Sequence, residues 1–153
     1  MKKLNKKGFT LVELLAVIVI LAVVILIAVT AVLPRMEKAR TNSFKDEAMV
    51  LVRAAQEAFV ITSNENANGV GTTCFTVATL TNATTGYVEL KGDKTYVGKI
   101  VLDSSGNVIK VYLDDTKNKF VIKNADYQAD SNLNLASSYT TLSSTLKNCQ
   151  SGE

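Results

Sequence analysis

The sequence contains no histidine, no tryptophan, one proline and two cysteines among its 153 residues. Without histidine, no side chain changes its charge near neutral pH unless its surroundings shift its pKa strongly. The chain also lacks residues spaced like metal ligands and a nucleophile supported by a neighbouring base. These absences exclude the commonest catalytic arrangements, so we expect no enzyme, no catalytic residue, no metal and no other cofactor.

The charge is also unevenly placed along the chain. The formal net charge is +3, and Lys2, Lys3, Lys6 and Lys7 supply four positive charges before Gly8. Without that segment the side chains would have one net negative charge, three minus four. Overall charge therefore gives no argument for a nucleic-acid partner, and none is expected.

An uncharged run dominates the N-terminal third: residues 14–33 read LLAVIVILAVVILIAVTAVL. A helix of this length can cross the hydrocarbon core of a bilayer. The preceding lysines predict a cytoplasmic N-terminus, although Arg35, Lys38 and Arg40 offset part of the asymmetry. A helix that is apolar on all sides must be covered on all sides, by lipid or by other copies of itself.

Two simpler explanations of this run account for less of the sequence. A secretory signal has an apolar core of about 7–15 residues and then a cleavage site, so this run is too long, although Ala28 and Thr30 offer a weak site. A plain membrane anchor explains the run and the lysines. It gives no reason for Glu13 inside the apolar stretch, or for Gly8-Phe9 at its edge.

The segment KKGFTLVELL, residues 6–15, resembles the type III leader of type IV pilins and the related pseudopilins. The resemblance is strong over residues 2–33, and elsewhere covers only the general layout. It implies that a membrane aspartyl peptidase, the prepilin peptidase, cuts after Gly8 and methylates the new amine of Phe9. Pilins usually carry a helix-disturbing proline slightly earlier, where this chain has Thr30. Pro34 is expected to bend or loosen the helix here.

Glu13 has a physical reason to need a partner. A charged residue in hydrocarbon costs about 2.5–3.5 kcal/mol on insertion scales. The resemblance implies that the Glu13 carboxylate pairs with the Phe9 amine of a neighbouring subunit, and such a buried ion pair would set the stagger between subunits. The alternative is a carboxylate that reaches the headgroups without a specific partner.

We expect three segments: a leader, 1–8, that is removed; a transmembrane and filament-core helix, 9–34; and a globular head, 35–153. Within the head, the helix should continue as an amphipathic segment to Thr62, because apolar residues recur at spacings of three and four. A helix from Phe9 to Thr62 would be roughly 80 Å long, so half of it must extend beyond a domain of this size. The predicted buried face comprises Phe44, Ala48, Leu51, Ala55, Ala58, Phe59 and Thr62.

Strand signals follow at 99–103, 108–113 and 119–123, separated by turns at 104–107 and 114–118. Ile109, Val111 and Leu113 are expected on one face of the second strand. A helical turn is expected within 76–82, and a weak helix within 131–147. The predicted fold class is α+β, with a long N-terminal helix on a small antiparallel sheet, which resembles the pilin fold.

A disulfide between Cys74 and Cys149 is expected, because the N-terminus indicates export to a compartment where disulfides persist. The bond would close a loop of about 75 residues and contribute on the order of 4 kcal/mol in the chain-entropy model. A reduced structural pair is the alternative.

Other motifs are weak. The GDKT segment, 92–95, lacks the spacing of a phosphate-binding loop and is expected to be a turn. Asp103, Ser105 and Asn107 resemble part of a calcium loop, but a hairpin turn is favoured. The glycosylation sequon at Asn82 is attributed to chance, and Asp114-Asp115 to a solvated turn. Local DNA contact is a minor alternative for four lysines: Lys91, Lys94, Lys99 and Lys110.

The resulting hypothesis is a structural subunit of a type IV pilus, anchored in the cytoplasmic membrane before assembly and extracellular in the filament afterwards. The implied partners are other copies of the chain, the prepilin peptidase, the inner-membrane pilus assembly platform, the membrane itself, and host or abiotic surfaces. The first alternative is a pseudopilin of a type II secretion or competence DNA-uptake pseudopilus. A single-copy anchored binding module is an alternative from another class.

Overall fold

We describe the protein from a computed structural model, which defines residues 10–65, 71–84, 86–90, 95–129 and 133–149. The chain divides into two compact units, Met1–Arg40 and Thr41–Glu153. Each unit is described separately below.

The first unit consists, where described, of the N-terminal part of helix α1, which is assigned to Leu11–Glu65. Every residue from Thr10 to Arg40 is exposed. The helix is assigned as continuous through Pro34. Proline has no backbone amide hydrogen to donate to the carbonyl oxygen of Thr30. The hydroxyl of Thr30 donates to the carbonyl oxygen of Ile27 at 2.9 Å.

The second unit begins with the amphipathic part of α1. The predicted buried face is confirmed from Phe44 to Phe59, while Thr62 is half-buried and donates its hydroxyl to the carbonyl oxygen of Ala58 at 2.8 Å. Val52 and Ala54, which lie beside the predicted stripe, are buried as well. The buried face is therefore wider than a spacing of three and four predicts.

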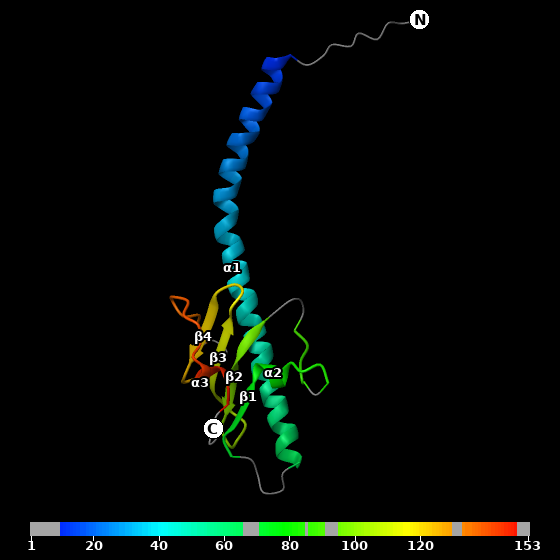
Figure 1. The fold of residues 1–153 in the computed structure, drawn as a ribbon, viewed down its shortest axis with the longest axis vertical. Coiled ribbons are helices and arrows are strands. Elements are labelled where there is room, and N and C mark those ends of the chain that lie inside the picture. Colours follow the sequence, from blue (N-terminus) through cyan, green and yellow to red (C-terminus); the bar gives the residue numbers. More distant parts are fainter. Residues whose placement is uncertain (1–9, 66–70, 85, 91–94, 130–132, 150–153) are drawn as a thin grey trace, which may run out of the picture. The chain divides into compact units, whose positions relative to one another are not determined.

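Four antiparallel strands form one sheet in the order β1-β2-β3-β4 (Figure 1). Their bounds are Thr73–Thr76 for β1, Tyr96–Leu102 for β2, Val108–Asp115 for β3 and Phe120–Asn124 for β4. The three predicted strands are confirmed with small changes at their ends. Strand β1 was not predicted, because its four residues, TCFT, are too few for a clear alternation.

A bulge in the β2–β3 pair changes which side chains of β3 enter the core. Val101 pairs with Lys110, but Leu102 pairs with Val108, so one extra residue is inserted in β3. Val108, Val111 and Leu113 are consequently in the core, and Ile109 is half-buried outside it. The prediction that Ile109 shares a face with Val111 and Leu113 was wrong, because a bulge shifts the alternation by one residue.

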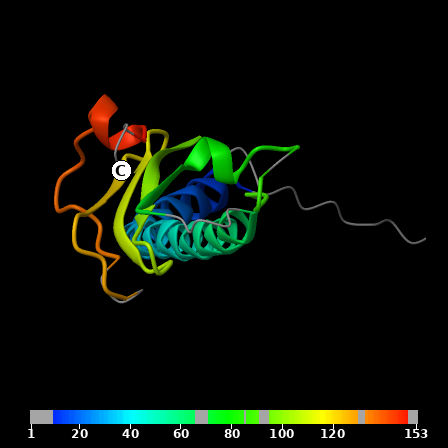
Figure 2. The same ribbon diagram turned by 90° about the horizontal axis from the view of Figure 1, so that it is seen from below.

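The sheet separates two packed layers. One face contacts residues 44–59 of α1 through a core that includes Ile100, Leu102 and Ile122. The C-terminal segment and helix α3, Ser144–Lys147, cover the other face (Figure 2). Helix α2, Val77–Leu80, confirms the predicted helical turn and is capped by the Thr76 hydroxyl, which accepts from the Thr79 amide at 3.1 Å.

One glycine is required by close strand packing. Gly98 in β2 has a φ of 149°, and a Cβ there would lie 2.0 Å from the carbonyl oxygen of Tyr112. No other residue fits this position without moving β3. Gly98 therefore allows β2 and β3 to approach closely at this point in the sheet.

Candidate functional site in the N-terminal helix

The candidate site begins at the residues predicted to be processed. Gly8 and Phe9 lie outside the described residues. Thr10 and Glu13 are described, and they form a reciprocal pair at the start of α1. The Glu13 carboxylate accepts hydrogen bonds from the amide and the hydroxyl of Thr10, both at 2.8 Å, and the Glu13 amide donates to the Thr10 hydroxyl at 3.3 Å.

This arrangement is a capping box, in which Thr at the N-cap and Glu three residues later each satisfy a backbone amide of the other. Sequence reasoning assigned Glu13 a partner in another subunit and overlooked Thr10. The T-x-x-E spacing before an apolar run is the signal that could have identified it. Glu13 thus has a partner in its own chain in addition to any that assembly provides.

The helix that follows presents apolar side chains on every side. Among the described residues, α1 is the one helix long and apolar enough to cross a membrane, and none of that stretch is buried. Leu11 is 81% exposed and Leu26 is 69% exposed. In water such a surface would strongly favour association, so this part of the chain requires lipid or other apolar helices around it.

The two cysteines are 75 residues apart in the sequence but meet at the edge of the sheet. The sulfur atoms of Cys74 and Cys149 are 2.05 Å apart and their Cα atoms are 5.6 Å apart, as in a disulfide. Cys74 belongs to β1, and Cys149 follows α3. The pair fastens the C-terminal segment to the first strand.

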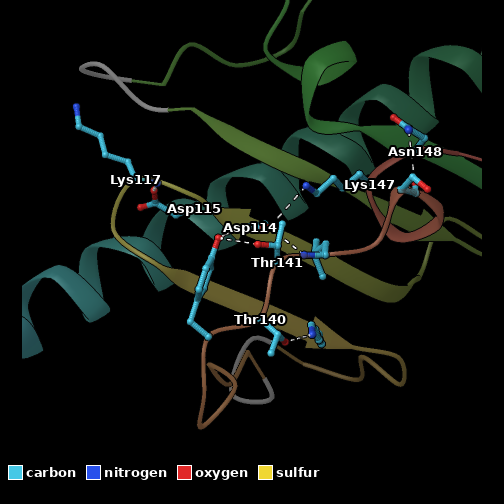
Figure 3. A network of polar contacts seen from close by, with 11 residues as sticks. Asp114, Asp115, Lys117, Thr140, Thr141, Lys147 and Asn148 are labelled. Carbon is cyan, nitrogen blue, oxygen red and sulfur yellow. Dashed lines mark hydrogen bonds and ion pairs between the residues drawn. The ribbon is translucent and has the colours of Figure 1, made fainter.

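A second attachment of the C-terminal segment lies on β3. Asp114 is fully buried and accepts hydrogen bonds from the hydroxyl of Tyr139 and the amide of Leu142, both at 3.0 Å (Figure 3). The amine of Lys147 lies 4.0 Å from the same carboxylate. The polar contacts of Asp114 therefore connect β3 to three positions of the segment that ends at Cys149.

The expectation that Asp114 and Asp115 form a solvated turn was wrong. Both belong to β3, and Asp115 is only 2% exposed. Asp115 accepts from the amides of Lys117 and Asn118, both at 3.1 Å, and so shapes the β3–β4 turn from inside. The prediction rested only on the polarity of the two residues. It failed because both carboxylates are buried together with hydrogen-bonding partners.

Asp103 organises the β2–β3 turn in the same manner. Its carboxylate accepts from the amides of Asn107 at 2.9 Å and Ser105 at 2.8 Å, and from the Asn107 side chain at 3.1 Å. These bonds, chiefly the one from the Asn107 amide, hold the pKa of Asp103 below its usual value. The favoured hairpin is confirmed, and the described residues include no group of side chains arranged to hold a metal ion.

The lysines considered for DNA contact do not form one exposed surface in the described structure. Lys99 is only 1% exposed and so cannot contact DNA from the surface, and Lys110 is half-buried. Lys91 and Lys94 lie outside the described residues, as do most residues of the expected turn at 92–95. At the sequon, Asn82 is exposed and its side chain accepts from the Thr84 amide at 2.9 Å.

Comparison with known families identifies the N-terminal segment. Residues 3–29 match the family model of the prokaryotic N-terminal methylation motif. The chain carries this motif. The match agrees with the resemblance to the leader of type IV pilins and pseudopilins. No curated protein and no solved structure gives a significant match to the chain.

Proposed function

We propose that this chain is a structural subunit of a type IV pilus. It is inserted in the cytoplasmic membrane as a prepilin, cleaved after Gly8, methylated at Phe9 and polymerised through α1. The observation that carries the proposal is an apolar helix that is exposed on all sides, begins beside the capped Glu13 and lies largely within the matched methylation motif. Leaving lipid for a bundle of identical helices changes solvation little, so packing between copies can decide the equilibrium.

The proposed domain arrangement divides the chain into three segments with different roles. Residues 1–8 form the leader, residues 9–34 serve as the membrane anchor and later as the filament core, and residues 35–153 form the exported head. Many identical contacts that do not close into a ring generate a fibre. The Cys74–Cys149 pair and the Asp114 contacts would then keep the C-terminal segment attached to the head outside the cell.

Within this proposal, Glu13 gains a second partner during assembly. In the isolated subunit its carboxylate is held by Thr10. In the filament it would also pair with the methylated Phe9 amine of the next copy. The free amine of Phe9 exists only after cleavage, so processing and assembly become linked through one carboxylate.

The test separates the charge of Glu13 from its capping role. Glu13→Gln keeps an acceptor suited to the capping box but removes the charge. We expect Glu13→Gln and Glu13→Ala to insert in the membrane and to yield no filaments by electron microscopy. Normal filaments from Glu13→Ala would contradict the role of the carboxylate. Long extracellular fibres would favour a pilus over the pseudopilus alternative, which predicts short fibres confined to the envelope.

A further inference from the structure

The C-terminal segment of the head, residues 133–149, covers the face of the sheet that points away from residues 44–59 of α1 (Figure 2), and we call it the strap. The strap is joined to β4 where Leu135 forms a bridge with Ile122 and the Ala136 amide donates to the carbonyl oxygen of Val121 at 2.9 Å. Val121 is buried on this outer face. The strap therefore seals the outer face of the sheet.

Asp114 is the polar anchor of the strap. It pairs with Val97 of β2 on one side and with Val121 of β4 on the other, so it lies inside the sheet and not at its edge. Its two carboxylate oxygens accept from different parts of the strap, Oδ1 from the Tyr139 hydroxyl and Oδ2 from the Leu142 amide. A buried carboxylate needs such donors, so the docked strap and the buried charge stabilise each other.

The path from Leu142 to Cys149 is fixed by further contacts. Helix α3 begins directly after Ser143, whose carbonyl oxygen accepts from the amide of Lys147 at 3.2 Å. The amine of Lys147 returns to within 4.0 Å of Asp114 (Figure 3). Asp114 thus contacts the strap both before and within the helical turn that leads to Cys149.

The partner cysteine is placed independently of the strap. Cys74 lies in β1, where it pairs with Val101 of β2, and its neighbour Phe75 is packed in the core. Sheet pairing therefore positions Cys74, and the contacts of Asp114 position Cys149. Neither placement requires a covalent bond between the two sulfur atoms.

We propose that Asp114 is a positioning residue for disulfide formation. It docks the strap while the head is still in its dithiol form and so brings Cys149 to Cys74 before oxidation. The disulfide then locks a strap that is already closed. Because such coupling is reciprocal, contacts that favour the bond are favoured by it to the same extent. The inference concerns the head alone and depends on neither membrane anchoring nor polymerisation.

The oxidant in this step is a disulfide of a small molecule or of a protein. One cysteine thiolate attacks it, forms a mixed disulfide and releases the first oxidant thiolate. The second cysteine then attacks the cysteine sulfur of the mixed disulfide and expels the other oxidant thiolate. Two electrons pass from the cysteines to the oxidant, and their two thiol protons end on its released sulfur atoms.

The competing second attack comes from a cysteine of another copy of the chain, which would cross-link the two copies. The outcome depends on the effective concentration of Cys149 at Cys74 relative to the concentration of other copies. A docked strap raises the first quantity and leaves the second unchanged. Asp114 therefore directs the head toward the bond within one chain.

The first experiment equilibrates the full chain in detergent micelles with reduced and oxidised glutathione, and mass spectrometry after alkylation measures the oxidised fraction. Asp114→Ala should lower the equilibrium constant for the Cys74–Cys149 bond at least about tenfold, because one hydrogen bond to a charged acceptor contributes about that factor. Asp114→Asn retains one acceptor oxygen and should give a smaller decrease. Asp126→Ala, at an exposed position, is the control and should leave the constant unchanged.

The second experiment follows hydrogen exchange of the Leu142 amide in the reduced full chain, because exchange detects local opening while the rest of the head stays folded. In the reduced wild type we expect this amide to be protected. In reduced Asp114→Ala it should exchange at least about tenfold faster, while the amides of β2 and β3 remain protected. If Asp114→Ala does not fold, Tyr139→Phe keeps the carboxylate and should cause smaller changes in the same direction.

Three results would overturn the inference. A Leu142 amide that is unprotected in the reduced wild type, with the sheet still protected, would show that the disulfide alone holds the strap. An unchanged equilibrium constant in Asp114→Ala would show that Asp114 does not position Cys149. Cross-linked dimers on non-reducing gels should increase during oxidation of Asp114→Ala, and an equal increase in Asp126→Ala would contradict the role of the strap in directing the bond.

Discussion

The two parts of helix α1 differ in whether their apolar side chains are exposed or buried. From Leu11 to Leu33 the side chains are exposed and, apart from Glu13 and Thr30, apolar, and no side of the helix is preferred. From Thr41 to Glu65 the exposed positions are mostly polar, and a wide apolar stripe is buried against the sheet. One helix therefore combines a segment that needs partners outside the chain with one whose partners the chain supplies. The same kind of residue should have a different role in each segment.

A matched pair of leucine substitutions should separate the two segments most clearly. Leu51 is fully buried and Leu21 is 52% exposed. Leu51→Ala should lower the free energy of unfolding of the head by about 2–5 kcal/mol, because a core cavity is left. Leu21→Ala should leave that free energy unchanged and weaken filaments instead. Denaturant unfolding of the full chain in detergent, followed by circular dichroism of the sheet, measures both variants.

An equal loss of stability in the two leucine variants would show that the division between the segments is wrong. Normal filaments and unchanged stability in Leu21→Ala would show that this position faces no other copy.

The head depends on buried polar contacts that the apolar segment lacks. Asp114→Ala removes the acceptor of the Tyr139 hydroxyl and the Leu142 amide. We expect a loss of about 1–3 kcal/mol, because the buried Leu142 amide is left without a partner. Thermal unfolding with the disulfide intact measures the loss. Asp126→Ala, at an exposed position on the same head, is the control, and an equal effect there would contradict the assigned role of Asp114.

The sequence predicted the periodic parts of this fold well, because long regular patterns determine which face is buried. The stripe from Phe44 to Phe59 and the three longer strands follow from spacing alone. Ile109 was misplaced because a bulge leaves no trace in a simple alternation. Asp114 was misplaced because its partners, Tyr139 and Leu142, are far away in the sequence.

At the candidate site, the methylation motif was predictable because it is a local pattern of residue types. The capping box was equally local, and only the T-x-x-E spacing had been overlooked. Burial of Lys99 could not be predicted, because it requires knowledge of which segment covers the outer face of the sheet.

A smaller effect is expected at the start of the apolar segment. Thr10→Val removes the hydroxyl of the capping box, which should cost about 0.5–2 kcal/mol of local helix stability. Hydrogen exchange of the first helical turn in micelles should accelerate accordingly, while the sheet is unaffected. Thr10→Ser should restore protection because it keeps the hydroxyl. Unchanged exchange in Thr10→Val would mean that the capping box does not stabilise the processed N-terminus.

The smallest expected effect is acid sensitivity confined to the head. Backbone hydrogen bonds lower the pKa of Asp103 in the folded state, so its contribution to stability is present above the pKa of the unfolded chain. It should be lost as the pH falls below about 4 and through the lower folded pKa. Asp103→Asn should make the free energy of unfolding less dependent on pH in this acid range. An unchanged pH dependence would exclude Asp103 as its source.

The most direct test of the account is the intact mass and N-terminal sequence of the exported protein. A precursor whose apolar helix becomes a filament core must be cut in front of that helix and keep it. We predict a chain that begins at methylated Phe9 and retains the whole apolar run. An exported chain that still carries Met1 to Gly8, or one cut behind the run, would contradict the account.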